Sequence, residues 1–570
     1  MTNKIIADTL EEIALYLQAQ DVAFKPQAYE IAAQGVRDLN EELTEIYKRC
    51  GTKCIDDISG IGKSIAEKIE EMIQTGKIKE HRALKKQFPF PMLELTQIPD
   101  VGPKTALTLF QHLQIKTVAQ LEHAARQGKI ADVPGMGVKS QRKILRGIQF
   151  LKGSKGRRII HQVLPYAKRI VSQLQNTTGT THVDIAGSLR RHKETIGDID
   201  LIATTSKPKQ FVQIFISLPE IDRVLEQGSL KVMVQYKNGL TGDLLLLKPQ
   251  EYGAALLYFS GSREHNILLR EHAKRMGLKL SEHGLFKGTK RITSKTEKQI
   301  YASLGLQEIP PELRVGGDEI EIAKHHQIPE LIVYGSLKGD LQVQTDWSDG
   351  SASIEEMTRV AKTFGLSYMA VTDHTQTLAI TNGLDEKRLL KQGKEIDALN
   401  KKLKGFRVLK STECDIKKDG SLDLQDRVLK TLDVVSVSVH SNRLLPKQQM
   451  TERIIRALKH PLVHVFMHPT GRIVGVRDGY SVDMDRVIKA AKEYHVALEV
   501  NGSERLDIPE NCIRKAIDLG VKLTISSDAH EPEHFQNLDY GIGQARRGWV
   551  KKADVLNTKT CAEFLKAIKK

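Results

Sequence analysis

Hydrophobic positions near the start of the chain recur at the spacing of a helix. One helical face carries Ile6, Leu10, Ile13 and Leu17. Apolar residues repeated every three to four positions are typical of an amphipathic helix. No alternation of apolar and polar residues interrupts this pattern before residue 155. The sequence therefore predicts a helical N-terminal region.

Beyond residue 155 the pattern changes to short apolar runs separated by turns, which is typical of strands. The predicted strands lie near Val183–Ala186, Asp198–Thr204, Val232–Tyr236 and Asp243–Leu247. In the C-terminal third, strands alternate with helical stretches; examples are Tyr368–Val371, Val434–Val439, Ala497–Val500 and Lys522–Ile525. Repeated strand-then-helix units predict a β/α barrel whose chemistry lies at the C-terminal ends of its strands.

The stretch Gly187–Leu201 combines a small-residue turn, two arginines and two acids. Its opening Gly-Ser pair lets backbone N–H groups and a hydroxyl approach a phosphate, and Arg190 and Arg191 add guanidinium charge. Asp198 and Asp200 alternate on the next strand, so their carboxylates share one face. Carboxylates that close repel unless a divalent cation lies between them, and oxygen ligands favour Mg²⁺ or Mn²⁺. The pattern predicts a phosphoryl-transfer site.

Length and charge narrow the class of protein. A chain of 570 residues is too long for one core, so roughly three to five domains are expected. A formal net charge of +16 favours a polyanionic partner. The five scattered cysteines are not expected to form a disulfide framework, which fits a reducing cytoplasm. With neither a signal-peptide start nor an apolar run of spanning length, we expect a cytoplasmic protein with no membrane partner.

A glycine turn recurs in the helical region, at Ile58–Lys63, Ile98–Lys104 and Val133–Lys139. Backbone N–H groups of such a turn, next to a helix N-terminus, can hold a DNA phosphate, and the lysine adds a charge. The turns resemble the helix-hairpin-helix motif, which binds the DNA backbone without reading sequence. The residues expected to contact DNA are Gly60, Gly62, Lys63, Gly102, Lys104, Gly135, Gly137 and Lys139.

The Gly187–Leu201 pattern resembles the nucleotidyltransferase signature of the family X DNA polymerases, which include DNA polymerase beta. The resemblance implies that Asp243, which opens an apolar strand, is the third metal-binding acid beside Asp198 and Asp200. The family usually places an arginine two residues after this acid. Here that position is Leu245, which leaves the acid without its usual ion-pair partner. The resemblance also implies a nucleotide site formed by Gly187, Ser188, Arg191, Tyr258, Phe259, Gly261, Asn266 and Arg270.

Near the first glycine turn the chain is similar to the N-terminal deoxyribose-phosphate lyase domain of polymerase beta. Lys68 falls where that family carries its Schiff-base lysine, and Lys25 and Tyr29 fall in the stretch that helps hold the phosphate. A Schiff base requires a neutral amine, so burial or neighbouring cations must favour loss of the proton. A surface lysine that binds DNA is an equally good interpretation of Lys68.

Single histidines and acids at strand ends mark the C-terminal third, and on successive strands they indicate a multinuclear metal site. The region resembles the PHP domain, a seven-stranded barrel phosphoesterase. The resemblance implies that Zn²⁺ or Mn²⁺ is bound by Asp349, His374, Glu413, His440, His468, Asp528 and His530. Where the family has His-x-His, this chain has Gln342 and Gln344. Because an amide is a poorer ligand than imidazole, we expect weak or absent 3′–5′ exonuclease or abasic-site endonuclease activity.

The resemblance covers nearly the whole chain and implies a multidomain α+β and α/β protein. The expected parts are a helical lyase-like domain (1–90), fingers with two further helix-hairpin-helix motifs (91–155), a palm (156–257), a thumb (258–315), a linker (316–335) and a PHP barrel (336–570), with a basic hinge at Lys152–Gly156. The implied function is a template-directed DNA polymerase that fills short gaps in repair, working as a monomer with gapped or nicked DNA and dNTPs. Two alternatives are a nucleotidyltransferase with a non-DNA acceptor and a DNA-end bridging scaffold.

Overall fold

The structure is a computed structural model. It describes residues 3–23, 25–37, 42–56, 58, 61–96, 98, 101–153, 157–378 and 381–569. Its internal contacts divide the chain into two compact units, Met1–Lys155 and Gly156–Lys570. Gly60 and the end of the expected hinge, Ser154–Gly156, lie outside the described residues. Within the described ranges, every helix is too short or too polar to cross a membrane.

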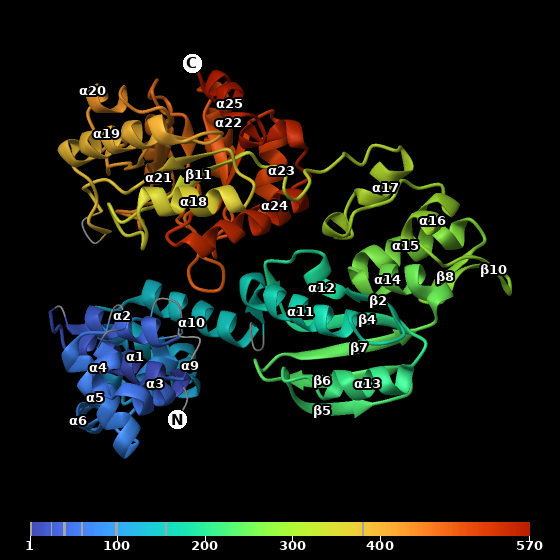
Figure 1. Cartoon of the computed structure of the whole chain (residues 1–570), viewed down its shortest axis with the longest axis horizontal. Helices are drawn as coiled ribbons and strands as arrows, with labels where there is room; N and C mark the ends of the chain where they lie inside the picture. The colour runs from blue at the N-terminus through green and yellow to red at the C-terminus, as the bar shows by residue number, and fades with distance from the viewer. Residues whose placement is uncertain are drawn as a thin grey trace. The chain divides into compact units, whose positions relative to one another are not determined.

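The described part of the first unit contains helices and no strand, as the apolar spacing predicted. Ile6, Leu10 and Ile13 of the first helix are fully buried in its core. The helices, blue to cyan in Figure 1, are α1 (Asn3–Ala19), α2 (Lys25–Arg37), α3 (Leu43–Cys50), α4 (Thr52–Asp56), α5 (Lys63–Thr75), α6 (Lys79–Gln87), α7 (Met92–Thr96), α8 (Pro103–Leu113), α9 (Val118–Arg126) and α10 (Val138–Gly153).

Each of the three glycine turns leads directly into a helix. Helices α5, α8 and α10 begin at the residues after Gly62, Gly102 and Gly137. A Cβ added to any of these glycines would meet no atom within 4 Å, so the space beside each turn is open. The first N–H groups of a helix have no partner within it, and an anion can bind them. The local geometry is therefore suited to a phosphate.

The cysteines depart from expectation, because Cys50 and Cys54 are joined by a disulfide. Gly51, with φ +70°, ends α3 and turns the chain before α4 begins. The two Cα atoms lie 5.9 Å apart, a separation typical of a disulfide. The spacing of four residues did not by itself indicate this pairing.

The palm contains a five-stranded sheet with strand order β2-β4-β7-β6-β5. Strands β4 and β7 pair in parallel, so Asp200 lies opposite Asp243. Helices α11 (Ile160–Gln175) and α13 (Pro208–Ile216) pack against one face, and α14 (Tyr252–Ser260) packs against the other. The strands are β2 (Thr180–Ile185), β4 (Asp198–Thr205), β5 (Ile221–Gln227), β6 (Lys231–Tyr236) and β7 (Thr241–Leu247).

One strand boundary in the palm differs from the expected one. Strand β7 begins at Thr241, so Asp243 lies inside it and does not open it. In the thumb, Ser262 caps the N-terminus of helix α15 (Arg263–Arg275). The remaining thumb elements are α16 (Glu297–Ser303) and a small antiparallel sheet of β8 (Lys279–Ser281), β9 (Gly284–Lys287) and β10 (Lys290–Thr293).

The C-terminal α/β region (Gly339–Ile568) contains a three-stranded and a five-stranded sheet, both parallel. Bridges at Val343–Ala529 and His374–Glu413 join residues near the strand ends. Parallel strands separated by helices agree with the α/β class. Closure of these strands into a seven-stranded barrel stays a prediction. The strands are β11 (Gly339–Val343), β12 (Tyr368–Val371), β13 (Arg407–Lys410), β14 (Glu413–Asp415), β15 (Ser436–Ser438), β16 (Val465–Phe466), β17 (Ala497–Asn501) and β18 (Leu523–Ser526).

Helices follow the strands of this region along the chain (Figure 1). They are α18 (Ile354–Thr363), α19 (Glu386–Lys402), α20 (Asp426–Leu429), α21 (Lys447–Leu458), α22 (Met484–Glu493), α23 (Glu510–Asp518), α24 (Asn537–Arg547) and α25 (Cys561–Ile568). Most residues of α24 are buried, so this helix lies between other elements and not at the surface.

Candidate functional site

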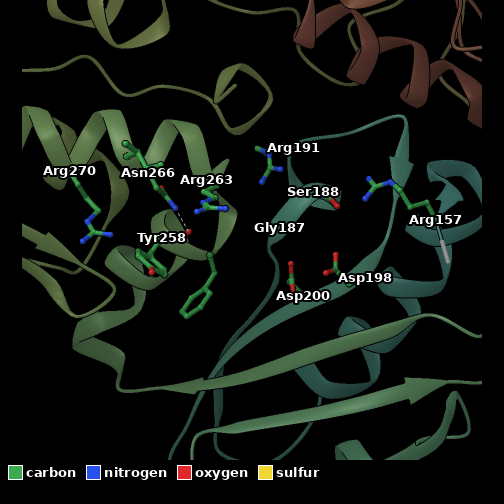
Figure 2. A pocket seen from close by; sticks show the side chains of 13 residues that line it. Arg157, Gly187, Ser188, Arg191, Asp198, Asp200, Tyr258, Arg263, Asn266 and Arg270 are labelled. Atoms are coloured by element: carbon green, nitrogen blue, oxygen red, sulfur yellow. Dashed lines mark hydrogen bonds between the residues drawn. The ribbon is translucent and has the colours of Figure 1, made fainter. Parts of the chain in front are cut away.

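A pocket of about 590 Å³ opens at the end of the palm sheet. Figure 2 shows Asp198 and Asp200 on one side of it and Tyr258, Asn266 and Arg270 on the other. The pocket brings together every nucleotide-site residue expected from the sequence, with two of the three acids. Its lining is Arg157, Gly187, Ser188, Arg191, Asp198, Asp200, Tyr258, Phe259, Gly261, Arg263, Asn266, Ile267 and Arg270.

The acids of the pocket crowd one another. Asp198 is exposed, Ile199 is buried and Asp200 is half-buried, as expected for alternating positions of a strand. Burial, then repulsion from Asp198 and Asp243, raises the pKa of Asp200 to about 7. A divalent cation would relieve this repulsion, because it compensates the charge that burial and neighbouring carboxylates disfavour.

Asp243 has an ion-pair partner after all. Lys231 lies on β6, directly opposite Leu245 of β7, and its Nζ is 2.8 Å from a carboxylate oxygen of Asp243. The cation expected two residues along the same strand is thus replaced by one from the neighbouring strand. The other oxygen of Asp243 is buried without a hydrogen-bond partner, so the acid keeps a free acceptor for a metal.

Gly187 is required by close packing at the phosphate turn. Its φ is +61°, and a Cβ there would lie 2.0 Å from Oδ2 of Asp200. The turn continues as the short helix α12 (Gly187–Arg190). Because no side chain intervenes, the backbone of the turn lies directly against Asp200.

The two arginines of the turn point to different places. Arg191 lines the pocket, whereas Arg190 donates to Glu297 of α16 at 2.6 and 2.9 Å and to Ser260. Fully buried Arg314 donates to the same Glu297 at 2.6 Å. Burial alone would raise the pKa of Glu297, but the two guanidinium groups lower it to about 2. The expectation that Arg190 adds charge at the mouth of the site is therefore wrong, and its role is to join the turn to the thumb.

Several buried polar atoms at this end of the palm have no partner. They are Ser188 Oγ, Arg191 Nε and Asp243 Oδ1. Leaving such atoms unpaired is costly unless a ligand completes them. A hydroxyl and a guanidinium suit phosphate oxygens, and a carboxylate suits a hard cation. These residues therefore fit Mg²⁺ or Mn²⁺ together with a triphosphate.

Three residues of the pocket were missed from the sequence. Arg157 lies at the start of the palm, and its Nε donates to Thr195 at 3.1 Å. Arg263 and Ile267 extend the face of α15 that carries Asn266 and Arg270. The i, i+3 and i+4 spacing on α15 would have identified Arg263 and Ile267. No local pattern singles out Arg157.

The C-terminal α/β region brings together all seven expected metal ligands. Asp349, His374 and His530 form one group whose ligand atoms lie within 4.8 Å of one another, and His374, Glu413 and His440 form another. His468 Nε2 lies 2.6 Å from Glu413, and His530 Nδ1 lies 4.0 Å from Asp528. Burial alone would raise the pKa of Glu413, but His440, His374 and His468 hold it well below its usual range. These two groups fit Zn²⁺ or Mn²⁺.

The glutamines do not fit a metal in this arrangement. The amide nitrogens of Gln342 and Gln344 donate to Oε2 of Glu413 at 3.1 and 3.2 Å. Asn501 donates to Gln342 at 3.0 Å and to Asp528 at 3.2 Å. Amide side chains therefore connect Glu413 to Asp528 through hydrogen bonds. Because their N–H groups repel a cation, this arrangement does not suit a metal ion at the two glutamines. Asn501 was missed from the sequence because a strand-end amide has no distinguishing spacing.

Lys68 lies in the first unit and forms an ion pair with an acid. Its Nζ contacts Glu80 and the hydroxyl of Tyr29, and Tyr29 donates to Glu80 at 2.6 Å. An ion pair stabilises the protonated amine, so an incoming sugar phosphate would have to displace Glu80. Lys25, at the start of α2, acts on the same carboxylate and helps to lower its pKa.

Comparison with known proteins agrees with this geometry. A family described as DNA polymerase beta thumb matches residues 255–315, one described as helix-hairpin-helix domain matches 1–78, and one described as SAM-like helix-hairpin-helix tandem matches 92–149. DNA polymerase/3′-5′ exonuclease PolX of Bacillus subtilis is 36% identical over 582 residues, which covers 99% of this chain and 100% of the relative.

Other relatives match parts of the chain. DNA polymerase lambda of Rattus norvegicus is 26% identical over 345 residues, or 55% of this chain and 56% of that protein. A probable phosphatase of Thermoanaerobacter is 32% identical over 232 residues, or 38% of this chain and 90% of that protein. The polymerase-type pocket and these similarities together define a DNA-directed DNA polymerase with a phosphatase-like, PHP-type region. The chain belongs to the family X DNA polymerases.

Replacing Gly187 by alanine tests the close approach of the phosphate turn to Asp200. We expect primer extension to fall by about a hundredfold, because the methyl group displaces the carboxylate from its position. Gly277→Ala is the matched control: its φ is +72° and no atom lies within 4 Å of an added Cβ. An equal loss of extension in both variants would show that backbone strain alone, about 1–2 kcal/mol, explains the effect.

Proposed function

We propose that this polymerase fills short gaps in DNA during base excision repair. The observation that carries the proposal is the pocket in which Ser188 and Arg191 face Asp198 and Asp200. Helix-hairpin-helix turns that hold a backbone without reading sequence suit an enzyme that acts at gaps of any sequence. Gapped or nicked DNA is then the substrate with dNTPs, the protein acts as a monomer, and its place is the cytoplasm, where bacterial DNA lies.

The acids and the turn have distinct roles in this proposal. Asp198, Asp200 and Asp243 would hold two divalent ions, which would supply Lewis-acid activation of the primer 3′-hydroxyl and compensate the charge of the triphosphate. Ser188 and Arg191 bind the phosphates and fix their orientation. The bulk of Tyr258 and Phe259 beside C2′ of the sugar excludes a ribose hydroxyl. Asn266, whose amide donates to the carbonyl of Tyr258 at 2.7 Å, and Arg270 contact the base and template side.

Primer extension on a one-nucleotide gap tests this function. We expect the parent to add one templated nucleotide with Mg²⁺ or Mn²⁺, and Asp200→Ala to lose about a thousandfold, since a buried metal ligand is gone. Asp222→Ala, which removes an exposed acid of β5, serves as the control and should extend normally. Unchanged extension by Asp200→Ala would refute the assignment, and a preference for an RNA or small-molecule acceptor would favour the alternative nucleotidyltransferase.

For the C-terminal α/β region we propose a metal-binding phosphoesterase domain of 3′–5′ exonuclease type with weak activity. The relative from Bacillus subtilis bears the name of an exonuclease, and the seven ligands lie together. The amides of Gln342 and Gln344 disfavour binding of a complete set of metal ions, because they direct N–H groups at the carboxylate of Glu413.

Restoring imidazoles tests this limit on hydrolysis. We expect the double variant Gln342→His with Gln344→His to bind about one more metal ion per chain. We also expect it to shorten a DNA 3′ end at least about ten times faster than the parent. The matched control, Gln342→Asn with Gln344→Asn, keeps the amides and should gain neither. Metal content is measured by elemental analysis. Shortening of the DNA 3′ end is measured in a separate assay without dNTPs. High activity in the parent, or no gain with histidines, would contradict the proposal.

We also propose a deoxyribose-phosphate lyase step at Lys68 once the substrate displaces Glu80. Its neutral amine adds to the sugar aldehyde and water is lost to form a Schiff base; loss of a C2′ proton then breaks the C3′–O bond and releases the 5′-phosphate end of the DNA. Lys25 and Tyr29 are expected to hold the phosphate. Lys68→Ala should abolish borohydride trapping on an incised abasic end and slow sugar-phosphate release about a hundredfold or more. The control Lys63→Ala removes an exposed DNA-binding lysine of the same helix and should weaken binding while keeping the trapped adduct. Release by Lys68→Ala at the parent rate excludes the lyase role.

A further inference from the structure

Within the second unit, the segment His192–Glu194 connects the nucleotide turn to the catalytic strand. It follows Arg191 and precedes β3 (Thr195–Ile196) and Asp198. Inside the palm it is held by the amide of Lys193, which donates to Ser188 O at 3.1 Å, and by the carbonyl of Glu194, which accepts from Ile160 at 3.1 Å. A shift of this segment would therefore move both the phosphate-binding turn and the acids.

The side chain of Glu194 is bound by the C-terminal α/β region. Its two carboxylate oxygens lie 2.6 and 3.4 Å from the terminal nitrogens of Arg472, and Gln544 of α24 donates to it at 2.8 Å. The side chains of Glu194 and Arg472 are only 21% and 16% exposed. A partly buried, two-pronged carboxylate–guanidinium contact is among the stronger polar interactions, and it fixes orientation as well as distance.

His192 is bound by the same helix. Its carbonyl accepts from Arg547 at 3.2 Å, and its Nε2 lies 3.0 Å from the hydroxyl of Tyr334. Its ring packs so closely on Gly543 that a Cβ there would lie 2.3 Å from Nδ1. Burial and the charge of Arg547 also lower the pKa of Arg191, so α24 acts electrostatically on the pocket itself.

We propose that the C-terminal α/β region positions the nucleotide turn of the palm through Arg472 and Gln544, which hold Glu194. These three are positioning residues for nucleotidyl transfer. The region thus supports polymerase activity whether or not it hydrolyses DNA. The inference rests on the polymerase function and gives the region a second role, as the support of one side of the nucleotide site.

Arg472 also lies on the loop that follows the metal ligand His468. The amide of Gly471 donates to the carbonyl of His468 at 2.8 Å, and Arg472 donates to the carbonyl of Leu506. The residue that holds Glu194 is therefore itself attached to the loop that carries His468 and to the segment at Leu506.

Kinetics of single-nucleotide insertion in the full chain test the proposal. Glu194→Gln and Arg472→Met are each expected to raise the KM for dNTP about threefold to tenfold. The double variant should be no worse than the more affected single, because both remove one contact. Arg472→Lys keeps the charge but cannot form the two-pronged contact, so its KM should lie between those of the parent and Arg472→Met. The control is Arg486→Met, which breaks the exposed ion pair of α22 with Glu452 of α21 and should leave the KM unchanged.

Hydrogen exchange of residues 187–198 gives a measurement that does not depend on activity. Exchange should rise in Arg472→Met and in the isosteric Glu194→Gln but not in Arg486→Met, at temperatures where all three stay folded. An unchanged KM and unchanged exchange, additive effects, or an equal change in Arg486→Met would overturn the proposal. A parent that extends no primer, with exchange still altered by Arg472→Met, would count against the polymerase function and not against this contact.

Discussion

Repulsion among the three carboxylates of the palm is the constraint on which the rest of this site depends. Two neighbouring parallel strands hold Asp200 opposite Asp243, with Asp198 two residues away, and the pKa of Asp200 rises to about 7 as a result of burial and this crowding. The surroundings reduce the cost without removing it: Lys231 pairs with one oxygen of Asp243, and the turn at Gly187 leaves no side chain between its backbone and Asp200. The repulsion among the carboxylates that remains favours binding of divalent cations.

Much of this site could be predicted from the sequence because its signals are local. Alternation on one strand placed Asp198 and Asp200 on one face, and one helix carries both Asn266 and Arg270 into the pocket. The helical character of the first unit followed from apolar spacing in the same way. Features that join distant segments could not be predicted. Lys231 reaches Asp243 across a strand pair whose register no motif specifies.

The same limit applies to the arginines and the cysteines. Arg190 and Arg191 are adjacent in sequence, yet one faces the pocket and the other binds Glu297 about a hundred residues later, which only tertiary packing decides. Cys50 and Cys54 form a disulfide across the end of α3, which their spacing alone did not indicate. In the C-terminal α/β region the ligands were identified by their strand-end positions. The hydrogen bond from Asn501 to Gln342 could not be predicted from the sequence.

The buried contact of Arg190 and Arg314 with Glu297 has an electrical consequence. Two guanidinium groups share one carboxylate, so this trio carries a net positive charge, and Arg314 is wholly screened from water. A charge in such surroundings acts over a longer range than one at the surface, and the charge of Arg314 is among the influences on the pKa of Arg191 in the pocket. The thumb therefore contributes a standing positive potential behind the turn, which draws a polyanion inward before any hydrogen bond to it has formed.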